Sequence, residues 1–380
     1  MTEKKQALSK EDVARLLSDP SGGARAETAA KIAVDFSVGV LGEREREMAE
    51  EIFRLMVKDA EIRVREALAQ NLKENPSVPH DVAVSLARDV ESVSIPVLRF
   101  SEVLTDEDLV EIIQSQDVDK QKAIASRPSV SEAVSDVLVG TSNEDVVSTL
   151  VSNQGAEISE GSLEKVISEM GESDAVQKAM AVRPHLPLTV SERLLNIVSQ
   201  HMQSELSKLR DLSIDMVADL VLRSRERATI GLTQGSSDEE LERLITQLHD
   251  NGRLTPSIIL RAACMGDMGF FDASVARLTG LPIENVRTLL HDSGEDGLGG
   301  VYTKAGLPPS HFPAVRAAVE VAAETEYDGG DNDRERYSRR MIERILTQYG
   351  DLGVDIEADD LEYLLAKMDQ LPADTLESAA

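Results

Sequence analysis

The chain has 380 residues and a formal net charge of -29, from 40 Lys and Arg against 69 Asp and Glu. A surface this acidic repels phosphate backbones and anionic lipid, so we expect neither nucleic acid nor a membrane as a partner. The hydrophobic share of 41% is typical of folded proteins, whereas the aromatic share of 3%, with no Trp, disfavours sandwiches and barrels and predicts an all-α fold.

The start of the chain is polar and charged, and no apolar run approaches the length of a membrane-spanning helix. We therefore expect no signal peptide, and a cytoplasmic location.

Residues 1–57 predict an N-terminal helical cap. This cap opens with a capping box at Ser9 and Asp12 and continues through a loop at 19–23 into two amphipathic helices. Such a segment would cover the apolar end of a repeat array.

A repeat occupies the middle of the chain. Three similar helical words begin at Arg65, Gln121 and Gln177, which are 56 residues apart both times. Each interval divides at an apolar residue that precedes Ser, Thr or Pro, the residue types that start helices. These apolar anchors are Val78, Leu104, Val130, Ile158 and Leu186, at steps of 26, 26, 28 and 28 residues. Residues 58–200 therefore predict an α-solenoid of short HEAT-like helical hairpins.

Local signals support the two helices of each hairpin. Thr105 with Asp108, and Thr189 with Glu192, have the spacing of a capping box. The second helix carries an Ala-x-Ala word, and alanine allows neighbouring helix backbones to approach closely.

The second helix of each hairpin tends to end on one polar residue. The favoured explanation is that these side chains satisfy the last carbonyls of the helix and complement its negative end. The alternative is that Arg99, Arg127 and Arg183 line a groove that binds an acidic peptide, a phosphate or a nucleotide. The candidate ligand- or partner-binding residues are Asn71, Arg99, Arg127, Asn153 and Arg183, at steps of 28, 28, 26 and 30 residues.

A second helical region follows the array, predicted as a C-terminal helical domain over 201–370 with a frayed tail at 371–380. The proline-free stretch from Ser191 to about Leu232 predicts one or two long helices. Basic strips at 223–227 and 334–340 are interleaved with glutamate, which favours solvated helix faces. Gly-Leu-Pro words at 280–282 and 306–308 repeat at a step of 26 residues, with an acidic, glycine-rich interhelical loop predicted at 292–300. Further helices are expected around Ile342 and Leu361.

The sequence contains no convincing catalytic or metal-binding pattern. The spacing around Gly280 matches a helix-turn-helix, but the second helix is too acidic for a reader of the DNA groove. The six histidines are scattered singly, and the one cysteine, Cys264, is expected to be buried and inert. The glycine-rich loop before Lys304 lacks the context of a phosphate-binding loop. We therefore predict no catalytic residue, no metal and no cofactor.

Several short segments of the sequence resemble segments of a known protein family. The stretches 123–131 and 179–184, together with 267–273 and 304–308, are similar to the bacterial domain-of-unknown-function family 2336, which is related to HEAT and leucine-rich-variant repeats. The resemblance covers about residues 58–350. It implies an α-solenoid and carries over no catalytic residues.

The sequence supports three hypotheses of function. The leading one is a non-enzymatic scaffold in bacterial regulation or signalling, which binds a protein with a basic surface. The second is a sensor in which Arg99, Arg127 and Arg183 hold an anionic small ligand or a nucleotide second messenger. An enzyme acting on nucleic-acid bases ranks last, because it would need a positive groove.

Overall fold

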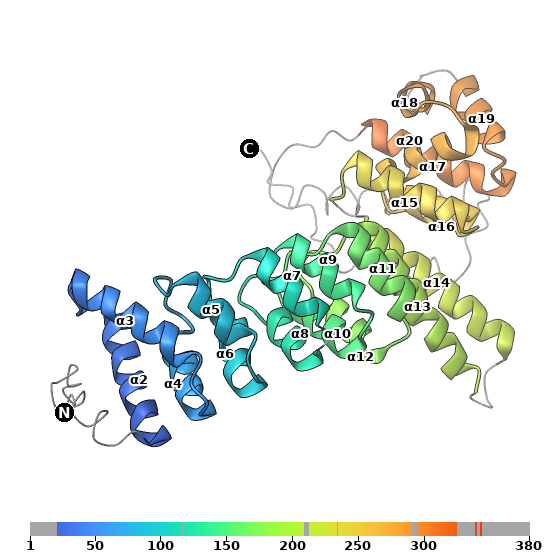
Figure 1. Cartoon of the computed structure of the whole chain (residues 1–380). Coiled ribbons are helices and arrows are strands. Elements are labelled where there is room, and N and C mark those ends of the chain that lie inside the picture. Colours follow the sequence, from blue (N-terminus) through green and yellow to red (C-terminus); the bar gives the residue numbers. More distant parts are fainter. Residues whose placement is uncertain are drawn as a thin grey trace, which may run out of the picture. The chain divides into compact units, whose positions relative to one another are not determined.

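The computed structural model describes residues 21–115, 117–208, 213–233, 235–290 and 295–324, together with Arg339 and Glu343 (Figure 1). Within these ranges the regular elements are helices, apart from one isolated parallel bridge between Val130 and Ala156, which confirms the all-α prediction. The contacts divide the chain into two compact units, Met1–Leu186 (unit 1) and Pro187–Ala380 (unit 2). The helices predicted near Ser9, Ile342 and Leu361, and the tail at 371–380, lie outside the described residues.

Unit 1 is a stack of helical hairpins. All five predicted anchors stand directly before the residue that caps a first helix, namely Pro79, Thr105, Ser131, Ser159 and Pro187. The capping box of Thr105 and Asp108 is also confirmed. The helices of unit 1 are α2 (Gly22–Val38), α3 (Glu43–Met56), α4 (Ile62–Leu72), α5 (His80–Ala87), α6 (Glu91–Phe100), α7 (Asp106–Gln114), α8 (Val118–Ala125), α9 (Glu132–Gly140), α10 (Glu144–Ser152), α11 (Glu160–Met170) and α12 (Asp174–Ala181).

The second helices form the more tightly packed layer of this stack. Helices α4, α6, α8, α10 and α12 each pack against the next, and these contacts are denser than those between successive first helices. Figure 1 shows the second helices side by side beneath the first helices α5, α7, α9 and α11. Ala69, Ala125 and Ala179 of the predicted words are buried between them, as expected from the small size of alanine. Ahead of the array, α2 packs along α4, and Phe36 meets Phe53 of α3 edge to face.

Unit 2 begins with a long helical hairpin and continues into a bundle with an apolar core around Phe270 and Phe271. The proline-free stretch after Ser191 forms two helices, and Gly280 (φ 68°) and Gly306 (φ 71°) end helices in the left-handed conformation that glycine tolerates. The described helices of unit 2 are α13 (Leu188–Leu206), α14 (Ile214–Leu232), α15 (Asp238–Asp250), α16 (Pro256–Cys264), α17 (Met268–Thr279), α18 (Ile283–Leu290), α19 (Glu295–Lys304) and α20 (Phe312–Glu324), with a short 3-10 helix η1 (Pro309–His311) before α20.

Two predictions about helix boundaries in unit 2 are wrong. Residues 295–300, expected in a loop, belong to α19, because burial of Leu298, Val301 and Tyr302 outweighs the low helix propensity of the glycines. The predicted capping box at Thr189 is also absent, because α13 already begins at Leu188 and Glu192 is buried.

The basic strip at 223–227 is not the solvated face that was predicted. Arg223, Arg225 and Arg227 are half-buried in α14, while the other predicted strip lies outside the described residues except for Arg339. Cys264 is buried, as expected.

Candidate functional site

Three of the five predicted site residues bind the backbone of the preceding repeat. Arg127, just after α8, donates from Nη2 to the Ser101 carbonyl at 2.7 Å and from Nη1 to the Leu98 carbonyl at the end of α6. Asn153, which caps α10, donates from Nδ2 to the carbonyls of Ala125 (2.9 Å) and Arg127 (2.7 Å). The ends of α6 and α8 are thus each held by a side chain that follows the next second helix.

Arg183 repeats this arrangement one step further along the stack. Its Nη1 donates to the carbonyls of Val151 and Asn153, each at 3.2 Å, and its Nη2 to the carbonyl of Ala156. We call the chain of hydrogen bonds from Arg183 through Asn153 to Arg127 the carbonyl relay. Carbonyls at helix ends are therefore satisfied, as the favoured explanation held, but they belong to the preceding repeat rather than to the side chain's own helix.

The electrostatics of the two relay arginines agree with this role. Burial lowers the pKa of Arg127, because desolvation disfavours the charged form, while Asp106 and Glu102 act in the opposite direction. Burial likewise lowers the pKa of Arg183. A guanidinium whose two amino groups already donate to fixed carbonyls has lost the fork that grips a phosphate or carboxylate in bidentate fashion. The geometry favours the structural role for these two residues.

Asn71 and Arg99 stand apart from the relay. Asn71 donates to the Ala67 carbonyl within its own helix at 2.7 Å, and its own carbonyl accepts from Ser37 of α2 at 3.2 Å. Asn71 also lines a surface pocket of about 280 Å³ between the ends of α2 and α4, shared with Ser37, Lys73 and Asn75. Of the five predicted residues, Asn71 is the one beside this pocket.

Two cations flank one aromatic ring next to this pocket. The Lys73 ammonium lies 4.8 Å from the ring centroid of Phe100, and the Arg99 guanidinium carbon lies 5.3 Å from the same centroid. Arg99 is exposed and makes no ion pair or hydrogen bond with any residue in the described ranges. An exposed cation beside an aromatic face can contact an anionic or aromatic group of a ligand.

The acidic excess of unit 1 is concentrated in one part of the stack. Residues 21–88 carry 10 Lys and Arg against 12 Asp and Glu, whereas residues 89–182 carry 6 against 19. Fourteen of these 19 acidic residues are exposed, among them Glu102, Glu107 and Glu132. The surface of α6 to α12 is therefore strongly negative, and that of α2 to α5 is nearly neutral.

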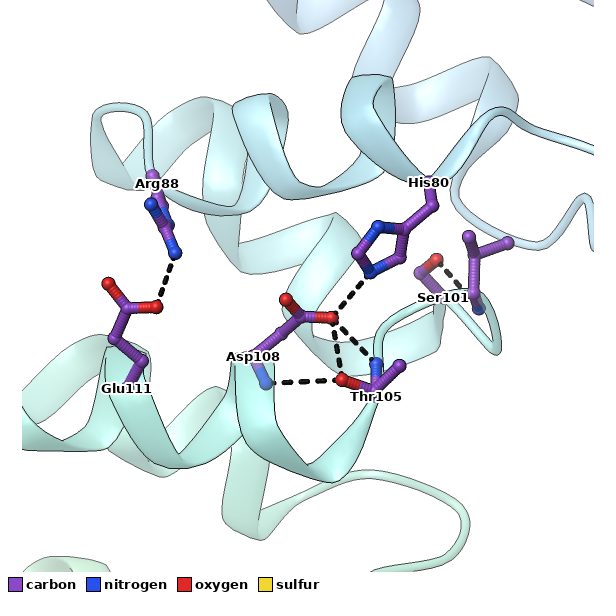
Figure 2. Close-up of polar contacts among 7 residues, drawn as sticks. His80, Arg88, Ser101, Thr105, Asp108 and Glu111 are labelled. Atoms are coloured by element: carbon purple, nitrogen blue, oxygen red, sulfur yellow. Dashed lines mark hydrogen bonds and ion pairs between the residues drawn. The ribbon is translucent and has the colours of Figure 1, made fainter.

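A second set of polar contacts joins successive first helices (Figure 2). His80 Nε2, at the start of α5, lies 2.7 Å from the Asp108 carboxylate of α7, and Arg88 Nη2 donates to Glu111 at 2.5 Å. Burial would raise the pKa of Asp108, but hydrogen bonds from His80 and Thr105 lower it below its usual value. Sequence reasoning missed this pair, although its separation of 28 residues equals the repeat step.

Unit 2 contains buried carboxylates that no sequence motif indicated. Glu226 of α14 accepts from Thr255 Oγ1 at 2.6 Å and from Ser257 Oγ at 2.7 Å. Glu192 of α13 pairs with Arg253 and accepts from Gln247 at 2.9 Å. Their partners lie 29 to 61 residues further along the chain, so no local spacing links each acid to its partner.

Asp272 of α17 is a third buried acid. Burial raises its pKa to about 6, although Arg287, 3.4 Å away, acts in the opposite direction. All three acids accept hydrogen bonds or pair with arginines inside the unit, and these contacts hold helices together.

Within the described ranges, no three His, Cys, Asp or Glu side chains come together as a metal-binding group, and no described helix is both long and apolar enough to cross a membrane.

Comparison with known proteins gives one match. The model of the family described as "Uncharacterised protein conserved in bacteria (DUF2336)" matches residues 93–355, which begin within α6 and include most of unit 2. No curated protein and no solved structure matches the chain. The match covers more than half of the chain and agrees with the resemblance carried by the words at 123–131, 179–184, 267–273 and 304–308. The chain therefore belongs to the bacterial family DUF2336.

Proposed function

We propose that the protein is a non-enzymatic helical-repeat scaffold in bacterial regulation or signalling, and that it binds a partner protein with a basic surface. The observation that carries this proposal is the concentration of negative charge on α6 to α12, a segment that contains 19 acidic and 6 basic residues. Complementary charge accelerates encounter and selects against partners of the same sign. The nearly neutral surface of 21–88 would not attract such a partner in this way.

The carbonyl relay supports the same function. Because Arg127, Asn153 and Arg183 fix successive repeats to one another, the exposed carboxylates between them are held at set spacings. A surface that is ordered before binding loses less conformational entropy when the partner arrives. Regular stacks of this kind present extended surfaces rather than enclosed cavities.

The test compares two charge-reversed forms of the full chain. Glu107→Lys with Glu132→Lys changes the acidic part, whereas Glu43→Lys with Glu47→Lys makes the same change of charge on α3. Each form and the wild type are immobilised, and proteins bound from a bacterial lysate are quantified by mass spectrometry. We expect a set of basic proteins that the first variant loses, the second variant keeps, and added salt releases. Identical sets on all three forms would contradict the proposal.

A second function, binding of an anionic small ligand, is favoured by a separate observation. Lys73 and Arg99 flank Phe100 beside the pocket that Asn71 lines, and Arg99 has no anionic partner among the described residues. This narrows the ligand hypothesis from the three repeat-spaced arginines to Arg99 and Lys73. A ligand at 100 times its dissociation constant raises the stability by about 2.7 kcal/mol. We expect a thermal shift with at least one member of a nucleotide panel, absent in Arg99→Ala and retained in Arg63→Ala.

A further inference from the structure

The exposed large hydrophobic side chains of unit 2 are confined to one hairpin. Among its described residues, those that are exposed all belong to α13 and α14. On α13 they are Val198 and Met202, four residues apart and so on one face of the helix. On α14 they include Met216 and Leu220, with the same spacing. We call these four residues the tip patch; Met202 is 52% exposed, Met216 60% and Leu220 53%.

Met202 of α13 and Leu220 of α14 lie at about the same level of the hairpin. Helices α13 and α14 pack side by side, and Arg225 Nη1 donates to Asn196 Oδ1 at 3.0 Å, which fixes their antiparallel register. Met202 lies six residues beyond Asn196 towards the tip, and Leu220 lies five residues beyond Arg225 in the same direction. At about 1.5 Å per residue, both are about 8 Å from this hydrogen bond along the hairpin.

Among the described residues, the base of the hairpin is anchored to the other helices of unit 2, whereas the ion pairs towards the tip lie within the hairpin itself. Near the base, Glu192 binds Gln247 of α15, and Glu226 binds Ser257 of α16. The buried residues of α13 all lie within its first five positions, 188–192. Towards the tip, α14 buries only Val217 and Val221 among its first eight residues. Two helices can bury one face of each against the other, so a further apolar face requires another layer of helices.

The charge of the hairpin makes a second copy the fitting partner. The whole chain has a net charge of -29, but residues 188–232 contain six Asp and Glu and six Lys and Arg, so this segment is neutral. Two ion pairs near the tip lie within the hairpin, Glu205 with Lys208 at 2.5 Å and Asp219 with Arg223 at 2.8 Å. Two copies that meet here bring no excess of like charge together, unlike copies that meet through α6 to α12.

We propose that the tip patch binds the tip patch of a second copy, so that two α13–α14 hairpins form a four-helix bundle about a two-fold axis. A two-fold axis brings the same surface of each copy into contact, which matches a patch that is flanked by two ion pairs within the hairpin. Met202, Met216 and Leu220 then form an apolar centre, and the Glu205–Lys208 and Asp219–Arg223 pairs form its polar rim. The proposal is independent of the partner protein suggested for unit 1.

The test measures the mass of the full chain in solution by light scattering and sedimentation equilibrium. We expect the wild type to be a dimer, and Met202→Glu with Leu220→Glu to raise the dimer dissociation constant by about 100-fold or more, because charges replace central apolar contacts. Met48→Glu, on the exposed face of α3, is the matched control and should remain dimeric. Circular dichroism establishes that each variant is folded.

A cross-linking experiment identifies the interface directly. The only native cysteine, Cys264, is buried, so a cysteine introduced by Met202→Cys reacts selectively. We expect rapid oxidation to a covalent dimer, and much slower oxidation of the control Met48→Cys. A wild type that stays monomeric at 100 times the concentration used for cross-linking would overturn the proposal, as would a dimer that survives both glutamate substitutions. A monomer whose Met202 is protected from oxidation would show instead that another segment of the chain covers the patch.

Discussion

The two units use polar side chains in opposite ways to hold their helices together. In unit 1, half-buried donors such as Arg127 and Arg183 reach backbone carbonyls 26 to 32 residues earlier, at the step of the repeat. In unit 2, the buried carboxylates of Glu192 and Glu226 accept from side chains 29 to 61 residues later, with no common step. Water can partly replace the first kind of contact when it is lost, whereas loss of the second leaves a charge buried without its partner. Unit 2 should therefore be the more sensitive to single polar substitutions.

The largest effect is expected at Glu192. Glu192→Ala leaves Arg253 without its buried partner, which should destabilise unit 2 by about 3–5 kcal/mol. Hydrogen exchange followed by mass spectrometry should show faster exchange in α13 and α15, with unit 1 unchanged. Glu205→Ala, exposed on the same helix, is the control and should leave the stability nearly unchanged. Equal losses of stability in Glu192→Ala and Glu205→Ala would contradict the expectation that unit 2 is the more sensitive to the loss of a buried polar contact.

The raised pKa of Asp272 gives unit 2 a pH dependence. Folding raises this pKa from 3.8 to about 6, so between these pH values the folded state binds a proton that the unfolded state lacks. The stability contributed by this group is therefore present at low pH and is lost as pH rises to about 6. Relative to the wild type, Asp272→Asn should gain on the order of 2 kcal/mol between pH 4 and pH 7. Chemical denaturation at the two pH values measures this, and the exposed Asp215→Asn should follow the wild type.

Unit 1 should be sensitive to bulk where its repeats approach closely. A Cβ atom at Gly155 would lie 2.0 Å from the Pro128 carbonyl oxygen, so the loop before α11 would have to move away from the preceding repeat. Gly155→Ala should cost about 2 kcal/mol in the unfolding of unit 1. Gly161→Ala, in α11 with no atom near the added Cβ, should instead stabilise by about 0.5 kcal/mol. Thermal unfolding of the two variants gives the comparison.

The smallest effect tests the carbonyl relay. Arg127→Ala removes two hydrogen bonds to the end of α6, and we expect a loss of about 1.5 kcal/mol, because Arg127 is only half-buried and water can enter the space its side chain leaves. Arg99→Ala changes the same residue type at the preceding repeat position, where no carbonyl is bound, and should cost less than about 0.5 kcal/mol. Hydrogen exchange at the C-terminal end of α6 separates the two. Equal losses would show that the relay does not hold the repeats.

The sequence predicted features that depend on neighbouring residues or on the repeat. The capping box of Thr105 and Asp108, the residues that cap each first helix, and the positions of the relay side chains were all predicted. The carbonyls that Arg127 and Arg183 bind were not, because spacing alone does not distinguish a residue's own helix from the preceding one.

Unit 2 was harder to predict because its contacts are distant. Glu192 has the spacing of a cap for Thr189, yet Arg253, 61 residues away, determines where its side chain lies. The helix at 295–304 forms despite its glycines, because the core of the unit buries Leu298 and Val301. The sequence hints at one of the buried acids, since Glu226 lies on the face of α14 that also carries Thr229, Ile230 and Thr233 at helical spacing.

The direction of the carbonyl relay has a consequence for synthesis of the chain. Each donor lies C-terminal to its acceptors, as Arg127 does to Leu98, Asn153 to Ala125, and Arg183 to Val151. When a new hairpin leaves the ribosome, the carbonyls it must bind already belong to a folded neighbour, and its own carbonyls stay hydrated until the next hairpin arrives. When the stack grows from its N-terminal end, the carbonyls that Arg127 and Arg183 bind are therefore in place before each arginine becomes half-buried.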